Sequence, residues 1–318
     1  MLPKVIATMA PPESVSSQLS DFCELLTCDP ATGVIPDEWL QSADGMLCTL
    51  NTPVTAGLFS RAPQLKVVSS VSVGVDHIDL DAATAAAVPV GNTPGVLVDS
   101  TADLALGLML AVTRRLPEAD QFVRKGEWTN AWSTGFFLGT DLSRSTVGLI
   151  GLGPIGQAVA KRALAFGARV IGWTRTPREI PGVELMSMDE VLSGADITSL
   201  HTALVPETRN LIGARELALM KPGAILINTA RGGLIDEPAL VDVLQAGRLK
   251  AGLDVFAEEP LPANSPLLTT PNTVLVPHLG SATAATRQAM LDRAVINLRA
   301  GLAGEPLPYC VNPEAYDA

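Results

Sequence analysis

The segment GLGPIG, residues 151–156, has the glycine spacing of a turn that binds the diphosphate of a dinucleotide. It follows the apolar run TVGLI and precedes QAVAKRALAFGA, so the strand, turn and helix that the motif requires come in the right order. The first glycine would permit a tight turn, the second would let the backbone approach the diphosphate, and the third would let the helix pack closely. We expect the diphosphate to lie at the start of the helix. The candidate cofactor residues of the turn are Gly151, Gly153, Pro154, Ile155 and Gly156.

A cation stands where an acid would follow in an NAD-binding domain. About 20 residues after the glycine motif, an Asp or Glu usually binds the ribose 2′-hydroxyl of NAD, but this chain has Arg175 there. Arg175 and Arg178 could bind a 2′-phosphate, with the hydroxyl groups of Thr174 and Thr176 donating hydrogen bonds. The alternative is a solvated loop after the strand, although that would leave the ribose of NAD without its acidic partner. The pattern therefore favours NADP(H) over NAD(H).

Three histidines are candidates for proton transfer, because imidazole titrates near neutral pH. His278, in VPHLGSAT, and His201, in ITSLHT, each end a predicted strand, at the edge where α/β sheets bind ligands. His201 belongs to the half of the sheet that normally lies near the nucleotide. His77 follows a predicted strand closer to the N-terminus, in VGVDHID. Position in the sequence does not choose between the three.

Short β-rich runs alternate with helical patterns along the chain, which predicts parallel sheets built from βαβ units. A long helix separates two series of runs, and we expect it to begin at Ser100, because Ser100 and Asp103 form an S-x-x-D start signal. The aromatic segment 126–144 after this helix is interpreted as an excursion between domains. The first series of runs is 4–9, 23–28, 45–50, 66–71 and 88–92. The second is 146–151, 168–173, 196–201, 224–230, 251–256 and 273–278.

The second series carries the glycine turn on its first run, and we expect it to form a complete, doubly wound Rossmann domain of six strands. A final helix, about 283–303, cannot extend that sheet, so we infer that it returns to the first domain. The predicted fold is therefore α/β with two doubly wound parallel-sheet lobes and a cleft between them. A dinucleotide-binding Rossmann domain, 100–283, would be inserted in a flavodoxin-like, substrate-binding domain made of 1–99 and 284–318.

The composition narrows the possible partners. The chain of 318 residues carries a formal net charge of −11, from 22 Lys and Arg against 33 Asp and Glu, which argues against a nucleic-acid surface. No run of about 18 uncharged apolar residues predicts a membrane span. The four cysteines show no C-x-x-C spacing, which favours free thiols in a reducing cytoplasm and implies neither a metal site nor a disulfide.

Three segments narrow the chemistry: INTARGGLIDEPAL (227–240), AGLDVFAEEPLP (251–262) and VPHLGSAT (276–283). In order and spacing they resemble the Arg, Glu and His motifs of the D-isomer-specific 2-hydroxyacid dehydrogenases. SVGVDHIDLDAA, STADLALGLMLA and RRLPEA extend the resemblance through the first domain, so that it covers nearly the whole chain. Within this family, GEWTNAW, STVGLIGLGPIGQAVA, EPLPANSPLL and PHLGSAT are similar to the glyoxylate/hydroxypyruvate reductases.

The resemblance implies roles for three side chains: Arg231 would bind the substrate, Glu259 would be the acid of a dyad, and His278 would donate the proton. Elementary chemistry agrees with these roles. A planar guanidinium can bridge the carboxylate and the carbonyl of a 2-oxo acid, and an imidazolium held by a carboxylate can protonate the oxygen that gains charge during hydride transfer. The alternatives are a strand-end ion pair for Arg231, the neighbouring Glu258 as the acid, and a structural histidine at position 278.

The resemblance also implies supporting contacts. The backbone N–H groups of Val73 and Gly74 would give a second grip on the substrate carboxylate, and Ser281 would place a hydroxyl near the substrate unless it caps the last helix. Asp254 would bind the nicotinamide amide unless it caps the end of its strand. No metal site is expected, because Arg231 already polarises the substrate. Further cofactor contacts are implied for Thr101, Thr202, Ala203, Thr229, Ala230, His278 and Gly280.

A homodimer through the region 100–144 is a further implication of the resemblance. In the reductase branch an aromatic side chain of this region reaches the active site of the partner subunit. The local sequence differs from that branch by about one inserted residue, so that either Trp132 or Phe136 could take this place.

The expected activity is the NADPH-dependent reduction of glyoxylate to glycolate and of hydroxypyruvate to D-glycerate. The alternatives are a bulkier 2-oxo acid such as 2-ketogluconate, oxidation of phosphite, and a dinucleotide-sensing scaffold without catalysis. A scaffold has no need to keep Arg231, Glu259 and His278 together, and this chain has all three.

Overall fold

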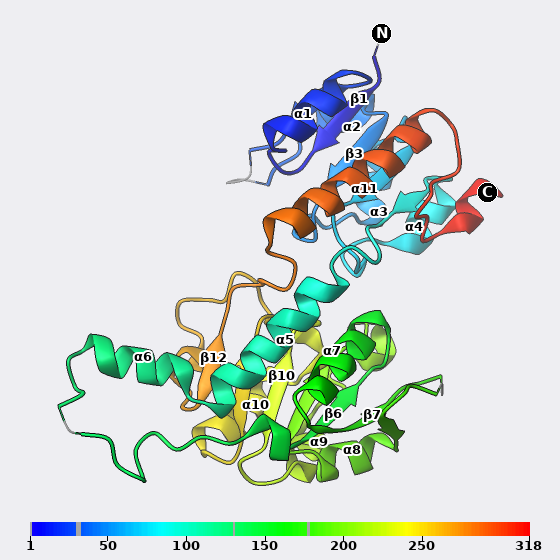
Figure 1. Cartoon of the computed structure of the whole chain (residues 1–318). Helices are drawn as coiled ribbons and strands as arrows, with labels where there is room; N and C mark the ends of the chain where they lie inside the picture. The colour runs from blue at the N-terminus through cyan, green and yellow to red at the C-terminus, as the bar shows by residue number, and fades with distance from the viewer. Residues whose placement is uncertain (1, 30–32, 130, 177–178) are drawn as a thin grey trace. The chain divides into compact units, whose positions relative to one another are not determined.

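The computed structural model describes residues 2–29, 33–129, 131–176 and 179–318 (Figure 1). The chain divides into two compact units: unit 1 comprises Met1–Leu97 and Thr283–Ala318, and unit 2 comprises Val98–Ala282. Among the described residues each unit contains one sheet, and its strands pair in parallel. The doubly wound α/β class predicted from the alternating runs is confirmed.

The described part of unit 1 has a five-stranded sheet in the order β2-β1-β3-β4-β5. This is the flavodoxin-like strand order. Its inner strands β3 and β4 are buried along their whole length, as expected for a parallel sheet covered by helices on both faces. The strands are β1 (Lys4–Ala7), β2 (Glu24–Thr27), β3 (Gly45–Cys48), β4 (Val67–Ser70) and β5 (Val90–Gly91).

Helix α11 (Ala284–Leu302) packs on β3 and β4, so the last part of the chain completes the unit that the first part begins. Its N-cap is Thr283, whose hydroxyl accepts the N–H of Thr286 at 3.2 Å, and Ser281 is therefore not the capping residue. The other helices of unit 1 are α1 (Glu13–Ser20), α2 (Asp37–Ser42), α3 (Ala56–Arg61), α4 (Leu80–Ala85) and a 3-10 turn at Pro313–Tyr316.

The described part of unit 2 has a seven-stranded sheet in the order β12-β11-β10-β9-β6-β7-β8. Counted from β6, this is the Rossmann order 3-2-1-4-5-6 with one more strand beyond the sixth. The prediction of six strands was wrong by one, since β8 was missed: it has three residues, two of them exposed, and therefore shows no apolar strand pattern. The strands are β6 (Thr146–Ile150), β7 (Arg169–Trp173), β8 (Val183–Leu185), β9 (Ile197–Leu200), β10 (Ile225–Asn228), β11 (Lys250–Leu253) and β12 (Thr273–Leu275).

Helix α5 (Val98–Thr113) begins two residues before the predicted start at Ser100. The S-x-x-D residues have other partners: the hydroxyl of Ser100 donates to the carbonyl of Gly280 at 3.0 Å, and the carboxylate of Asp103 accepts from Arg162 at 2.6 Å. Because α5 packs on α7, β10 and β11, tertiary contacts extend it beyond its local start signal. The other helices of unit 2 are α6 (Leu116–Arg124), α7 (Pro154–Ala165), α8 (Met188–Gly194), α9 (Ala214–Leu219) and α10 (Glu237–Gln245), with 3-10 turns at Leu142–Arg144, Pro206–Thr208, Gly232–Leu234 and Pro266–Thr269.

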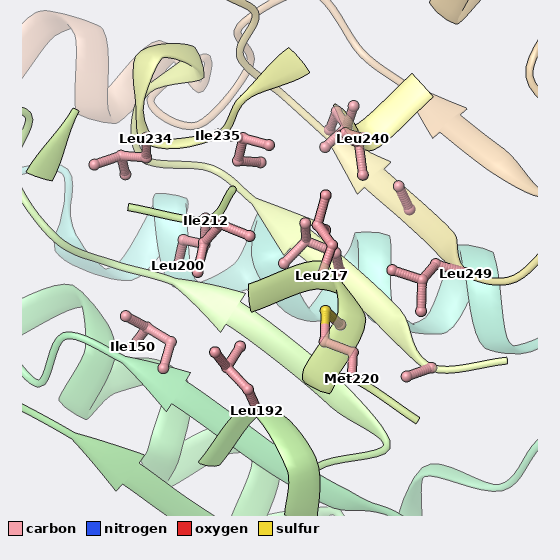
Figure 2. Close-up of a cluster of buried hydrophobic side chains, with 14 of the residues drawn as sticks. Ile150, Leu192, Leu200, Ile212, Leu217, Met220, Leu234, Ile235, Leu240 and Leu249 are labelled. Atoms are coloured by element: carbon pink, nitrogen blue, oxygen red, sulfur yellow. The ribbon is translucent and has the colours of Figure 1, made fainter. Parts of the chain in front are cut away.

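Two apolar clusters cover the sheet of unit 2. Figure 2 shows one of them, in which Ile150 and Leu200 from the strands meet Leu192, Leu217 and other side chains of the helices. The second cluster packs α5 and α7 against the same strands. These clusters hold the strand ends, and the loops that follow them, in fixed positions.

The described residues of the segments 116–129 and 131–138, together called the arm, depart from this packing. Helix α6, with which the arm begins, has no buried residue. The rings of Phe122, Phe136 and Phe137 pack edge to face within the arm, with centroids 4.9–5.6 Å apart. In Figure 1, α6 extends away from the sheet of unit 2. None of the described helices has the length and apolarity that a membrane-spanning helix needs.

Candidate active site

The glycine turn joins β6 to α7 at the carboxyl edge of the sheet. Gly151 has φ +99°, a conformation that side chains rarely allow, and an added Cβ would lie 2.7 Å from the backbone of His201. At Gly156 an added Cβ would lie 2.1 Å from the carbonyl oxygen of Gly151. At Gly153 it would meet no described atom within 4 Å. The packing of the chain therefore requires glycine at 151 and 156, whereas it places no such requirement on position 153.

Arg175 lies in an exposed loop after β7. Strand β7 pairs in parallel with β6, so Arg175 and the glycine turn follow neighbouring strands at one edge of the sheet. The hydroxyl of Thr174 donates to the carbonyl of Thr176 at 3.4 Å within this loop. The second predicted cation, Arg178, lies outside the described residues.

Glu259 and His278 form a close pair in unit 2. Nδ1 of His278 lies 2.7 Å from Oε2 of Glu259, and these side chains are only 26% and 24% exposed. Oε1 of the same carboxylate accepts the N–H of Phe256 at 2.9 Å. The acid of the pair is thus Glu259 and not the neighbouring Glu258. Because Nδ1 directs its proton at the carboxylate, Nε2 is the ring nitrogen that faces away from the pair.

Electrostatics keep this acid ionised. Burial by itself would raise the pKa of Glu259, but hydrogen bonds from His278 and Phe256, together with the charges of His278 and Arg231, hold it below the ordinary value of a glutamate. Glu259 is therefore an anion at neutral pH. A carboxylate at Nδ1 orients the imidazole ring.

Asp254, at the end of β11, holds the loop that carries His278. The residue is completely buried, and its carboxylate accepts the N–H groups of Leu279 at 2.5 Å and Gly280 at 2.9 Å. Its carbonyl accepts the N–H of His278 at 2.9 Å. Burial raises the pKa of Asp254, although the two N–H groups oppose the rise. These bonds are the strand-end capping that the sequence analysis gave as the alternative to a nicotinamide contact for Asp254. They also hold the backbone of His278 at φ +54°, a conformation that is uncommon for residues other than glycine.

Arg231 follows β10 on a loop that Asn228 fastens from inside the protein. Asn228 is completely buried; its Nδ2 donates to the carbonyl of Arg231 at 2.8 Å, and its Oδ1 accepts the N–H of Ala230 at 3.0 Å. An added Cβ at Gly232 would lie 1.9 Å from the carbonyl of Phe256, so this loop presses on the residue whose N–H binds the dyad acid. The role of Asn228 was missed from the sequence, because it lies within an apolar strand run and carries no signal of its own.

Two predicted cofactor contacts have hydroxyl groups that are buried and find no hydrogen-bond partner among the described residues: Thr202 after β9 and Thr229 after β10. Buried polar groups in proteins nearly always have a partner, so these hydroxyls fit a bound polar ligand at this edge of the sheet. Thr101 differs, because its hydroxyl donates to the carbonyl of Gly280 at 3.1 Å. The carbonyl of Ala203 accepts the hydroxyl of Thr208 at 2.7 Å.

The other two histidines have different surroundings from His278. Burial lowers the pKa of His201 to about 4, so it is neutral at physiological pH. His77 lies in unit 1, with Nε2 3.1 Å from the hydroxyl of Ser70. His278, by contrast with the neutral His201, is paired with the carboxylate of Glu259.

Unit 1 carries the predicted carboxylate grip. Val73 and Gly74 follow β4, and neither backbone N–H donates to another described residue. Ser281, the predicted hydroxyl on the substrate side, is buried in unit 2.

The thiols take part in none of these contacts. Cys23, Cys28 and Cys48 are buried and free, and Cys310 is free and partly buried. Burial raises the pKa of Cys23 to about 11 and that of Cys48 to about 12, so both stay protonated at neutral pH. No group of three His, Cys, Asp or Glu side chains suited to a metal ion occurs among the described residues.

Comparison with known proteins agrees with this architecture. Residues 106–280 match the model of the D-isomer specific 2-hydroxyacid dehydrogenase NAD-binding domain. The chain belongs to the D-isomer-specific 2-hydroxyacid dehydrogenases, a family of oxidoreductases, and unit 2 holds its NAD-binding domain.

Among individual relatives, the chain is 42% identical over 322 residues to the glyoxylate reductase of Thermofilum pendens, covering 98% of this chain and 95% of the relative. The structure of the NADPH-dependent glyoxylate/hydroxypyruvate reductase of Sinorhizobium meliloti, solved with NADP and malonate, aligns with a TM-score of 0.88 at 34% identity and covers 99% of this chain and 98% of that one. The D-lactate dehydrogenase of Aquifex aeolicus, solved with NAD and lactic acid, aligns with a TM-score of 0.87 at 29% identity, covering 97% and 99%.

Proposed function

We propose that this protein is a cytoplasmic NADPH-dependent reductase of small 2-oxo acids, converting glyoxylate to glycolate and hydroxypyruvate to D-glycerate. The observation that carries the proposal is the Glu259–His278 pair at 2.7 Å, in the unit that also holds Arg231 and the glycine turn. A carboxylate–imidazole pair can deliver a proton, which is what reduction of a carbonyl requires besides a hydride. The glyoxylate reductase of Thermofilum pendens, to which the chain is similar over nearly its whole length, supports this choice of substrate.

The residues fit a nicotinamide dinucleotide. The glycine turn would hold its diphosphate, and the unpartnered hydroxyls of Thr202 and Thr229 would donate to it. When bound, the reduced nicotinamide supplies the hydride for the carbonyl carbon. Asp254 keeps the loop of His278 in place through Leu279 and Gly280, and a direct contact with the nicotinamide amide remains part of the proposal.

The remaining chemistry belongs to three side chains. Arg231 binds the carboxylate and the keto oxygen of the substrate together, because its planar guanidinium offers parallel N–H donors. Nε2 of His278 then donates a proton to the oxygen as negative charge develops there. Glu259 holds Nδ1 and, as an anion, stabilises the imidazolium before the transfer.

The preference for NADPH rests on Arg175. It stands after β7, where NAD-binding members of this fold place an acid for the ribose hydroxyl. A guanidinium at this position can bind a 2′-phosphate through charge-assisted hydrogen bonds. Both cofactors occur in similar structures, NADP in the Sinorhizobium meliloti reductase and NAD in the Aquifex aeolicus enzyme. These structures therefore do not choose between the cofactors, and our proposal of NADPH depends on Arg175.

We further propose that unit 1 is the substrate-binding domain, unit 2 the dinucleotide-binding domain, and the functional form a homodimer through 100–144. The arm offers an unusual number of exposed apolar side chains: Leu116, Val123, Trp128, Trp132, Phe136 and Leu138 are 40–79% exposed. A second copy would cover them, since large exposed apolar patches commonly mark interfaces. Phe136 packs within the arm itself, whereas Trp132 is 79% exposed, which favours Trp132 as the residue that reaches a partner's active site.

The test is oxidation of NADPH by the purified protein with glyoxylate, hydroxypyruvate, pyruvate and 2-ketogluconate. We expect glyoxylate and hydroxypyruvate to have the highest kcat/KM. His278→Ala should lower kcat by about 10²–10⁴-fold, the usual contribution of positioned proton transfer, and leave NADPH binding nearly intact. Equal kcat in this variant and the wild type would contradict the role of His278, and a preference for 2-ketogluconate would correct the substrate.

A further inference from the structure

The carbonyl groups of the turn Ser72–Gly74 are all bound by the protein. The carbonyl of Ser72 accepts the N–H of Thr93 at 2.9 Å, and the carbonyl of Val73 accepts Nδ2 of Asn92 at 2.8 Å. The carbonyl of Gly74 accepts the hydroxyl of Ser72 at 2.7 Å. Three successive carbonyls with three separate donors leave the turn little rotational freedom.

These bonds determine where the N–H groups of the turn point. In a trans peptide the N–H lies opposite the carbonyl of the same peptide plane. The carbonyls of Ser72 and Val73 both face the segment Asn92–Thr93, whereas successive carbonyls of a regular strand would face opposite ways. The N–H groups of Val73 and Gly74 therefore both point away from that segment, and neither donates to another described residue.

We propose that Asn92 and Ser72 are positioning residues, which aim the N–H groups of Val73 and Gly74 at the substrate carboxylate. This inference rests on the proposed function and on the expectation, implied by the family resemblance, that the turn is the second grip on the substrate carboxylate. Two N–H dipoles that are held in advance on the same side of the turn can bind an anion without a further cation in unit 1. Asn92 does not touch the substrate in this proposal; it acts through the peptide between Val73 and Gly74.

Asn92 is itself held from two sides. Its carbonyl accepts Nδ2 of Asn297 at 2.9 Å, and its N–H donates to the carbonyl of Tyr309 at 3.1 Å. Asn297, on α11, is completely buried, and its Oδ1 accepts the N–H of Tyr309 at 3.1 Å. An added Cβ at Gly91 would lie 2.6 Å from Nδ2 of Asn297, so the two segments are in close contact. The amide of Asn92 therefore reaches Val73 from a rigid base.

The hydroxyl of Ser72 belongs to a chain of hydrogen bonds with a single possible direction. A carbonyl can only accept, so Ser72 gives its one proton to Gly74. The hydroxyl of Ser70, 2.7 Å from that of Ser72, must then donate to it. With the proton of Ser70 committed, Nε2 of His77 at 3.1 Å must carry a proton and donate to Ser70. His77 thus serves the turn as a fixed donor.

The experiment compares glyoxylate with its neutral methyl ester, in the presence of NADPH. In Asn92→Ala we expect kcat/KM for glyoxylate to fall about tenfold, mainly through KM, because the N–H groups lose their fixed direction. The ester has no carboxylate for the turn to bind, so its kcat/KM should change less than about twofold. The ratio of kcat/KM for glyoxylate to kcat/KM for the ester measures the preference for the carboxylate. In Asn92→Ala this ratio should therefore fall together with kcat/KM for glyoxylate.

The matched control is Asn312→Ala. Asn312 is a buried asparagine of the same unit, and its Oδ1 accepts the N–H of Val90 at 2.7 Å, but it does not contact the turn. This variant should lower stability and keep the preference for glyoxylate. If Asn92→Ala does not fold, Ser72→Ala, which frees the carbonyl of Gly74, should lower the preference instead.

The outcomes separate the inference from the proposed function. A wild type that reduces neither compound would overturn the proposed function, and this inference with it. A wild type that prefers glyoxylate, beside an Asn92→Ala or Ser72→Ala variant with the same preference, would overturn the positioning role alone. An equal loss of preference in Asn312→Ala would also overturn it, because the effect would then be general softening of unit 1.

Discussion

Glu259 and His278, 19 positions apart in the chain, lie with Oε2 of one 2.7 Å from Nδ1 of the other. The second oxygen of Glu259 is engaged by the N–H of Phe256 at 2.9 Å, so the carboxylate cannot turn away. Both oxygens thus face donors, a requirement that an ionised carboxylate meets and an amide does not. The first two predictions follow from this geometry.

Glu259→Gln should lower kcat by about 10²-fold, since general acid catalysis by a well-placed imidazole is worth that or more and the variant presents an NH₂ group to one of the two donors. NADPH affinity, measured by fluorescence titration, should stay the same. Glu258→Gln is the matched control, because Glu258 is adjacent and exposed. Equal activity of Glu259→Gln and its control would contradict the dyad.

The lowered pKa of Glu259 makes a prediction for stability in acid. Its folded-state pKa is below that of the unfolded chain, so the unfolded state binds the proton more readily. The stabilisation from this group is complete above the unfolded value of about 4.3 and is lost as the pH falls through the folded value. The free energies of unfolding of the wild type and Glu259→Gln, measured in urea, should therefore differ at pH 7 and converge in acid. If their difference stays constant with pH, the titration of Glu259 does not contribute to stability.

Two glycines of one turn should respond differently to alanine. Gly156→Ala should reduce the free energy of unfolding by about 1–3 kcal/mol or more, as overpacking does, because its Cβ would lie 2.1 Å from the carbonyl oxygen of Gly151. Gly153→Ala meets no described atom within 4 Å, so it should leave Tm unchanged and weaken NADPH binding. Calorimetry and cofactor titration of both variants check this. Unchanged cofactor affinity in Gly153→Ala would argue against a diphosphate at the turn.

Arg175→Ala should raise KM for NADPH by about 10–100-fold, the usual scale for loss of hydrogen bonds to a charged group, and should change KM for NADH little. Arg178 stands close by in the sequence, so the double variant should show the larger effect. Arg144→Ala is a suitable control, because Arg144 belongs to the same unit and its side chain is 86% exposed. An equal increase in KM for NADPH and for NADH would contradict the proposed preference for NADPH.

The arm should decide the oligomeric state. Sedimentation analysis should find a dimer for the wild type and a shift towards monomer for the double variant Trp128→Ser and Leu138→Ser, whose side chains are 59% and 66% exposed. Leu268→Ser removes an apolar group elsewhere in unit 2 that is 52% exposed, and it should leave the dimer intact. A wild-type monomer at all concentrations would rule out the dimer.

Much of the fold was predictable, because its signals are local. Strand runs such as 146–151 and 224–230 are apolar stretches bounded by turn residues, and the glycine turn lies between one such run and a helical pattern. The short strand β8 escaped prediction because an edge strand of three residues shows no such stretch. The start of α5 at Val98 was missed because packing on α7 and the sheet, not its S-x-x-D signal, determines where it begins.

The sequence by itself determined the class of fold, the family and the candidate residues Arg231, Glu259 and His278, since these depend on residue type, order and spacing. Only the tertiary structure decided the hydrogen bonds around the candidate site. These are the pairing of Glu259 with His278, the bonds from Leu279 and Gly280 to Asp254, and, in unit 1, the bond from the side-chain amide of Asn92 to the carbonyl of Val73. The physical reason is that a hydrogen bond depends on distance and direction between groups that the chain brings together from separate strands. Residue spacing along the chain contains neither quantity.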